Sequence, residues 1–136
     1  MIQRIQSIWL LLAATCIALT IKLPYYSGTN AKGVASYELK ATENFWLFSV
    51  TIIATLLALL IIFFFKKRTL QLRLCVTGIF LEALLIFLYY REITTFTVGT
   101  YSLWAILHGV AVILFFLAAR AINKDEKLIK DSDRLR

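Results

Sequence analysis

Residues 72–90 read LRLCVTGIFLEALLIFLYY, a nearly unbroken apolar run with one acid, Glu82, close to its middle. A helix of about 20 apolar residues is long enough to cross the hydrocarbon core of a bilayer. A carboxyl group at that depth is costly and needs a partner. The run therefore predicts a membrane-spanning helix and, inside it, a polar contact made by Glu82.

Three further apolar blocks accompany this one, and hydrophobic residues make up 60% of the 136 residues. A soluble domain of this length needs more polar residues to cover its surface. We therefore predict an all-α fold, a polytopic membrane protein built as a four-transmembrane-helix bundle in one domain, residues 1–136. The spans are predicted at about residues 2–23, 45–65, 70–90 and 101–120, with an outer loop at 24–44 and a cytoplasmic tail at 121–136.

The first block and the loop after it carry local signals. MIQRIQSIWLLLAATCIALTI has the basic residue and apolar core of a signal peptide, but no small-residue cleavage pattern follows it, which favours a retained helix. In the outer loop, VASYEL at residues 34–39 alternates weakly between apolar and polar positions and predicts a short strand or hairpin.

The basic residues predict the orientation. Eleven of the fifteen Lys and Arg residues, Arg4 among them, fall on the side of this arrangement that holds both termini, and four fall on the other side. Such a bias places the basic side in the cytoplasm. Because the bases cluster beside the apolar blocks, the net charge of +7 indicates contact with lipid headgroups rather than nucleic acid.

Glu82 has one obvious candidate partner, His108, which is the single histidine of the chain. Both residues lie roughly 10–12 Å below the outer ends of their predicted helices, at about 1.5 Å per residue. Gly78 and Gly109 lie near the same faces and would let these two helices approach closely. The sequence therefore predicts an intramembrane polar pair, although the first helix could also lie against Glu82.

The role of this pair stays open between three interpretations. It can be a satisfied polar contact that fixes helix register, or a proton or ligand site in low dielectric. Alternatively, Glu82 is protonated and bonds a threonine or a backbone carbonyl. No cofactor or metal is predicted, because one histidine is too few for a bis-histidine haem site or a metal site. Cys16 and Cys75 lie at depths too different for a disulfide.

The tail, RAINKDEKLIKDSDRLR, mixes both charges with apolar residues. It predicts a helical extension that is either simply solvated or docks on a partner or on anionic lipid. The candidate docking residues are Lys124, Asp125, Glu126, Lys127, Arg134 and Arg136.

The opening MIQRIQSIWLLLAA and the closing AINKDEKLIKDSDRLR together resemble a family of small four-helix membrane proteins from Bacteroidota, domain of unknown function 4293. The resemblance spans the whole chain and implies a bacterial inner-membrane protein, and it supplies no activity, cofactor or catalytic residue. The chain is also similar in size to small four-helix multidrug exporters. Those carry an essential Glu in the first helix, where this chain has no acid.

Three functions are compatible with this pattern. The first is a non-catalytic accessory subunit of a larger inner-membrane complex for respiration, secretion or translocation, which implies lipids and other integral membrane subunits as partners and no nucleic acid. The alternative is a small homo-oligomeric proton-coupled transporter that uses Glu82. A membrane enzyme with a quinone or haem site at Glu82 and His108 ranks third, so no enzyme activity is expected.

Overall fold

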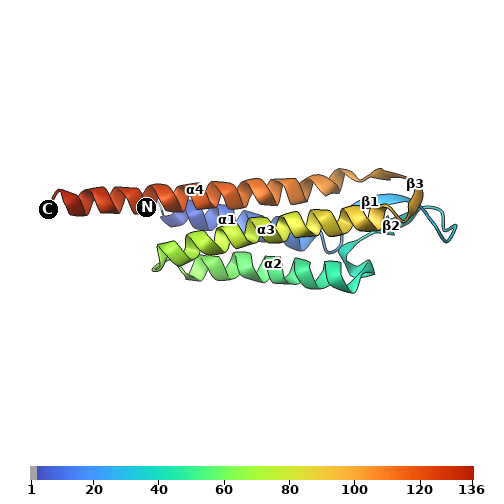
Figure 1. Ribbon diagram of the computed structural model, residues 1–136, viewed down its shortest axis with the longest axis horizontal. Helices are drawn as coiled ribbons and strands as arrows, with labels where there is room; N and C mark the ends of the chain where they lie inside the picture. The colour runs from blue at the N-terminus through green and yellow to red at the C-terminus, as the bar shows by residue number, and fades with distance from the viewer. Residues whose placement is uncertain (1–2) are drawn as a thin grey trace.

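The computed structural model describes residues 3–136, with side chains from residue 5 onward. Ile2, where the first span was predicted to begin, and the side chain of Arg4 lie outside the described part. The main elements of the described chain are four α-helices: α1 (Gln3–Leu19), α2 (Phe45–Phe63), α3 (Arg68–Ile93) and α4 (Ile106–Arg134). They lie side by side along the long axis, and both termini lie at the same end of the molecule (Figure 1).

Three of these helices, α2, α3 and α4, are long and apolar enough to cross a membrane. The remaining helix, α1, is shorter than predicted, because it ends at Leu19 rather than near residue 23. Thr20 closes its end by donating its hydroxyl to the Ile17 carbonyl at 2.6 Å, and Lys22 N–H bonds back to Leu19. At 1.5 Å per residue, 17 residues rise about 26 Å, a little less than the ~30 Å of a hydrocarbon core.

Each helix packs on the next in sequence, and α4 closes the ring against α1. Small residues fill the centre: Ala13, Ala54, Ala58, Ala111 and Ala118 are fully buried. A Cβ at Gly78 of α3 would lie 2.7 Å from the ring of Phe115 in α4, so the missing side chain is what lets these helices meet. Gly109 was expected to do the same, but a Cβ at this position would have no neighbouring atom within 4 Å.

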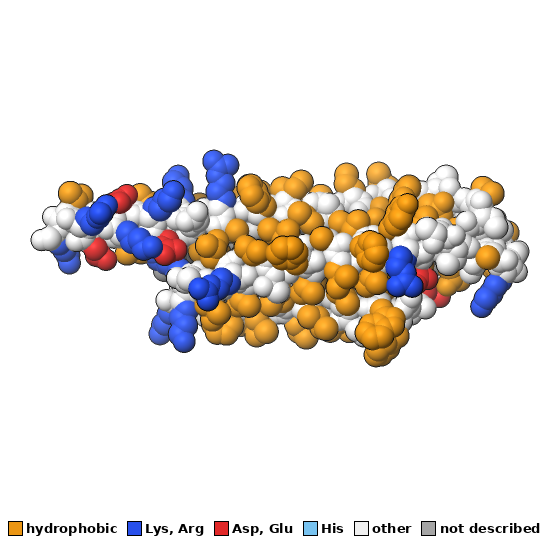
Figure 2. Space-filling view, in the orientation of Figure 1, with side chains coloured by type: hydrophobic (Ala, Val, Ile, Leu, Met, Phe, Trp, Pro, Cys, Tyr) orange, Lys and Arg blue, Asp and Glu red, His pale blue; other side chains and the backbone are white. Residues whose placement is uncertain are grey.

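The exterior of the bundle is apolar around its middle, and most of the visible Lys and Arg side chains gather at the end that holds the termini (Figure 2). Large apolar side chains are exposed on all four helices; examples are Leu11, Ile53, Phe80 and Phe116. Exposed apolar surface of this extent marks a surface that meets lipid or another protein.

The opposite end carries a small sheet, so the chain is mostly helical rather than all-helical. Its strands β1 (Tyr26–Asn30), β2 (Tyr37–Leu39) and β3 (Phe96–Tyr101) are antiparallel in the order β2-β1-β3. The strand predicted within residues 34–39 is β2, whereas β1 and residues 96–100 of β3 were predicted as loop. Tyr101, predicted to begin the fourth span, is the last residue of β3, and α4 begins at Ile106. Gly28 faces Gly99 across β1 and β3, and a Cβ on Gly28 would lie 2.2 Å from the Val98 carbonyl oxygen, which explains the glycine there.

Candidate functional site

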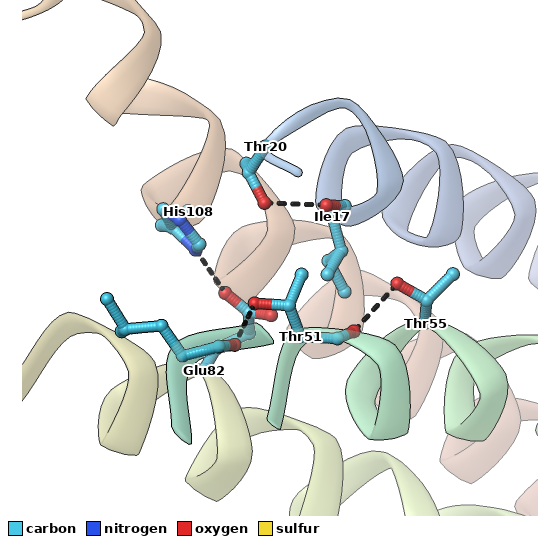
Figure 3. A network of polar contacts seen from close by, with 7 residues as sticks. Ile17, Thr20, Thr51, Thr55, Glu82 and His108 are labelled. Carbon is cyan, nitrogen blue, oxygen red and sulfur yellow. Dashed lines mark hydrogen bonds and ion pairs between the residues drawn. The ribbon is translucent and has the colours of Figure 1, made fainter. Parts of the chain in front are cut away.

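Glu82 of α3 and His108 of α4 meet inside the bundle. Glu82 Oε2 lies 2.9 Å from His108 Nδ1, and the two side chains are 0% and 1% exposed. Figure 3 shows the carboxyl group directed at the imidazole. The structure therefore places α4, and not α1, against Glu82 at hydrogen-bonding distance.

The helix pattern explains why the two side chains face inward. Residues 75, 78, 82, 85 and 89 of α3 are all buried, with spacings of three and four that keep them on one face. On α4 the buried face runs from His108 through residues 111, 115, 118, 122 and 125. Gly78 lies one turn before Glu82 and admits Phe115, so the close approach is built beside the pair.

Two tyrosine rings lie against the imidazole. The ring centroids of Tyr89 and Tyr25 lie 5.1 and 5.5 Å from that of His108. The two tyrosines also stack on each other, with centroids 4.2 Å apart and planes 11° from parallel. Tyr25, in the segment between α1 and β1, has a raised pKa because of burial and, second, because Tyr101 is near. Neither tyrosine was singled out from the sequence, although Tyr89 is seven residues, two helical turns, beyond Glu82.

Threonines near the pair have other partners. Thr51 of α2 donates its hydroxyl to the Leu47 carbonyl at 2.6 Å, and Thr20 donates to Ile17 (Figure 3). The interpretation in which Glu82 bonds a threonine or a carbonyl therefore does not describe this arrangement; its hydrogen-bond partner is His108.

Three buried polar atoms around the pair have no hydrogen-bond partner among the described residues: Glu82 Oε1, His108 Nε2 and the Tyr89 hydroxyl oxygen. Leaving a buried polar group unpaired costs roughly 1–3 kcal/mol. Together these atoms offer a carboxyl oxygen, an imidazole nitrogen and a phenol within one enclosed region. Such a set can hold and pass a proton.

A second buried polar contact lies at the opposite end of the bundle. Gln6 Nε2 of α1 donates to Asp125 Oδ2 of α4 at 2.6 Å, and Asp125 is 5% exposed. Arg68 also donates to the backbone carbonyl of Asp125, at 3.3 Å. This corrects the predicted docking set, because Asp125 faces the bundle. Its position in the three-and-four spacing of the α4 core was the signal that sequence reasoning missed.

The other candidate docking residues lie on or beside the extension of α4 past Asp125. Glu126 is half-buried and pairs with Lys130 at 2.8 Å. The remaining four are exposed: Lys124, Lys127, Arg134 and Arg136. Across residues 3–136, no group of three or more His, Cys, Asp or Glu side chains is arranged to hold a metal ion, and Cys16 and Cys75 are free thiols.

Comparison with known proteins gives one match, at the level of the family. No curated protein and no solved structure matches the chain. The family described as domain of unknown function (DUF4293) matches residues 2–135, almost the whole length. The chain therefore belongs to the DUF4293 family.

Proposed function

We propose that the chain is a multi-pass protein of a bacterial inner membrane, with four crossings and both termini in the cytoplasm, and that it is a non-catalytic accessory subunit of a larger membrane complex. The apolar exterior of all four helices supports the membrane location. The bases gathered at the end of the termini support the orientation (Figure 2). α1 is short by a few ångströms, a mismatch that a bilayer accommodates at modest cost.

The observation that carries the subunit role is the extension of α4. Beyond Asp125 the helix continues to Arg134 with most of its side chains exposed. The exposed apolar residues are Leu128 and Ile129 in the helix and Leu135 at its C-cap. Leu128 and Leu135 are seven residues, about two helical turns, apart, so exposed apolar side chains recur on one face of the extension past Asp125.

The direction of the extension favours a protein partner over lipid. It projects along the bundle axis, away from the apolar middle of the molecule (Figure 1). A helix in that direction leaves a membrane steeply and cannot lay this apolar face on the surface, as an interfacial helix does. An amphipathic helix that enters the groove of a partner subunit needs apolar anchors spaced as these are.

The test is capture of the tagged chain from its own host, at native expression and in mild detergent, with mass spectrometry of the proteins that accompany it. We expect a stoichiometric set of integral membrane subunits. Leu128→Gln combined with Leu135→Gln should release them, whereas Asp131→Asn, an exposed change on the same extension outside the candidate docking residues, should not. Recovery of this chain alone, as a defined oligomer, would contradict the subunit role.

The buried pair favours a second candidate, a small homo-oligomeric transporter coupled to protons through Glu82. One polar pair cannot line a pathway in one copy, so this function requires self-association. In proteoliposomes, Glu82→Gln should abolish proton-driven flux while the protein remains inserted and abundant. Flux equal to that of the wild type would exclude the transporter.

A further inference from the structure

We propose that Glu82, His108 and Tyr89 form a site that holds one exchangeable proton, and that this proton enters from the sheet end of the bundle past Tyr25. The proposal concerns the site itself and holds whether the chain is a subunit or a transporter. It rests on the contact between Glu82 and His108, on the three unpaired atoms around it, and on the way the sheet holds Tyr25.

The contact favours a pair that holds one proton more than a carboxylate beside a neutral imidazole. With that proton, the pair is either a carboxylate beside an imidazolium or a carboxylic acid beside a neutral imidazole, and both states have no net charge. Without it, a carboxylate stays buried beside a neutral ring; with a second proton, an imidazolium stays buried beside a neutral acid. Both side chains are at most 1% exposed, so either unbalanced state carries the cost of an uncompensated buried charge.

The burial of the Glu82–His108 pair favours a proton over a larger ligand. A fully buried pair 2.9 Å apart can gain or lose a proton without a cavity, whereas a larger ligand must open one. The proton can add at His108 Nε2, the ring nitrogen that Glu82 does not use. The Nδ1 proton then passes to Glu82 Oε2, which gives a carboxylic acid and a neutral imidazole protonated on Nε2. The reverse transfer restores the carboxylate and the imidazolium, which then releases its proton from Nε2.

The neighbouring titratable groups indicate where this proton enters. Tyr89 lies two turns beyond Glu82 toward the sheet, and its hydroxyl has no hydrogen-bond partner among the residues that the structure describes. Tyr25 stacks on its ring. Tyr101, at the end of β3, has its ring 6.2 Å from Tyr25. On the α1 side, Cys16 lies within electrostatic range of Glu82. The buried face of α2 carries no titratable side chain. The phenols therefore connect the pair to the sheet end.

The sheet fixes Tyr25 in this place. Tyr25 N–H donates to the Leu39 carbonyl of β2 at 2.8 Å, and the Tyr25 carbonyl accepts from Ser102 N–H at 3.0 Å. Its ring is half-buried, between His108 and the end of the molecule that carries the strands. Moving this segment would remove one of the two tyrosine rings that lie against the imidazole, and Tyr89 of α3 would remain.

The first experiment counts protons. Because His108 is the single histidine, ¹⁵N-histidine labelling gives an unambiguous NMR signal for it. At neutral pH we expect one of two results. The imidazole is doubly protonated and Glu82 gives no infrared band of a protonated carboxyl, or the imidazole is neutral and such a band is present and disappears in Glu82→Gln. A neutral imidazole without such a band would overturn the proposal, because the pair would then hold no extra proton.

The second experiment tests the entry route by hydrogen–deuterium exchange of the His108 ring N–H. Tyr25→Ala should speed exchange by about tenfold or more, because it removes one of the two rings that lie against the imidazole. Tyr25→Phe keeps the ring and should leave the rate near that of the wild type; Tyr25→Leu serves where the alanine variant does not fold. Exchange that is unchanged in both the alanine and leucine variants would overturn the route.

Discussion

Replacing the two members of the buried pair by leucine, singly and together, should give strongly non-additive effects on stability. In His108→Leu, the Glu82 carboxyl loses its hydrogen bond to the imidazole at 0% exposure. Removing one partner of a buried ion pair costs about 3–5 kcal/mol, and roughly 1–3 kcal/mol where the remaining group is neutral. Glu82→Leu leaves both imidazole nitrogens unpaired and should also destabilise, by about 1–3 kcal/mol.

The double variant should recover most of this loss. Replacing a buried pair by apolar residues of similar size is often neutral or stabilising by about 1–4 kcal/mol, because no polar group remains unpaired. The sum of the single effects should therefore exceed the double effect by about 3 kcal/mol or more. Reversible unfolding in denaturing detergent mixtures, followed by tryptophan fluorescence and circular dichroism, measures all four proteins. A cost below about 1 kcal/mol for His108→Leu would refute the reasoning, because the carboxyl would then be solvated or paired elsewhere.

Two further predictions concern the glycines near the buried pair and the hydrogen bond of Tyr37. Gly78→Ala should destabilise the bundle by about 1–2 kcal/mol in the same unfolding assay, because the methyl group meets the Phe115 ring, whereas Gly109→Ala, with open space, should stabilise by about 0.5–1 kcal/mol. In β2, the hydrogen bond to Glu43 raises the pKa of Tyr37 to about 12. The folded state therefore holds this proton more tightly than the unfolded state, and its stabilisation, complete below about pH 10, is lost as the pH rises toward 12. Difference absorbance of phenolate should place this titration lower in Glu43→Gln.

The four helices and the strand β2 could be predicted from the sequence, whereas the pairing of the three strands into a sheet could not. Apolar blocks and their flanking charges are local, so the number and approximate positions of the helices follow from composition, although their exact ends do not. β1 pairs with β3 about 70 residues away in the chain, and their register depends on Gly28 and Gly99 meeting, which no local pattern reveals. The end of α1 at Leu19 is likewise set by the turn that leads into this sheet.

The same distinction applies to the polar contacts. The contact between Glu82 and His108 could be predicted from the sequence, because they lie on consecutive helices and counting residues from the helix ends places them at a similar depth. Gln6 and Asp125 could not, because they are 119 residues apart and the contact depends on α4 closing the ring against α1. Tyr25 reaches His108 because its backbone is bonded to Leu39 of β2 and to Ser102, the residue after β3.

The Gln6–Asp125 and Glu82–His108 contacts both involve α4, and together they fix the position of this helix along its neighbours. Side chains such as alanine and leucine pack almost equally well when one helix slides along another, and in lipid no hydrophobic force opposes the slide. α4 is held against α1 by Asp125 near one end and against α3 by His108 near the other. A shift of one turn, about 5.4 Å, would break both contacts at once and leave four polar groups unpaired. The register of α4 therefore depends on two hydrogen-bonded pairs, and the position of its extension is fixed with it.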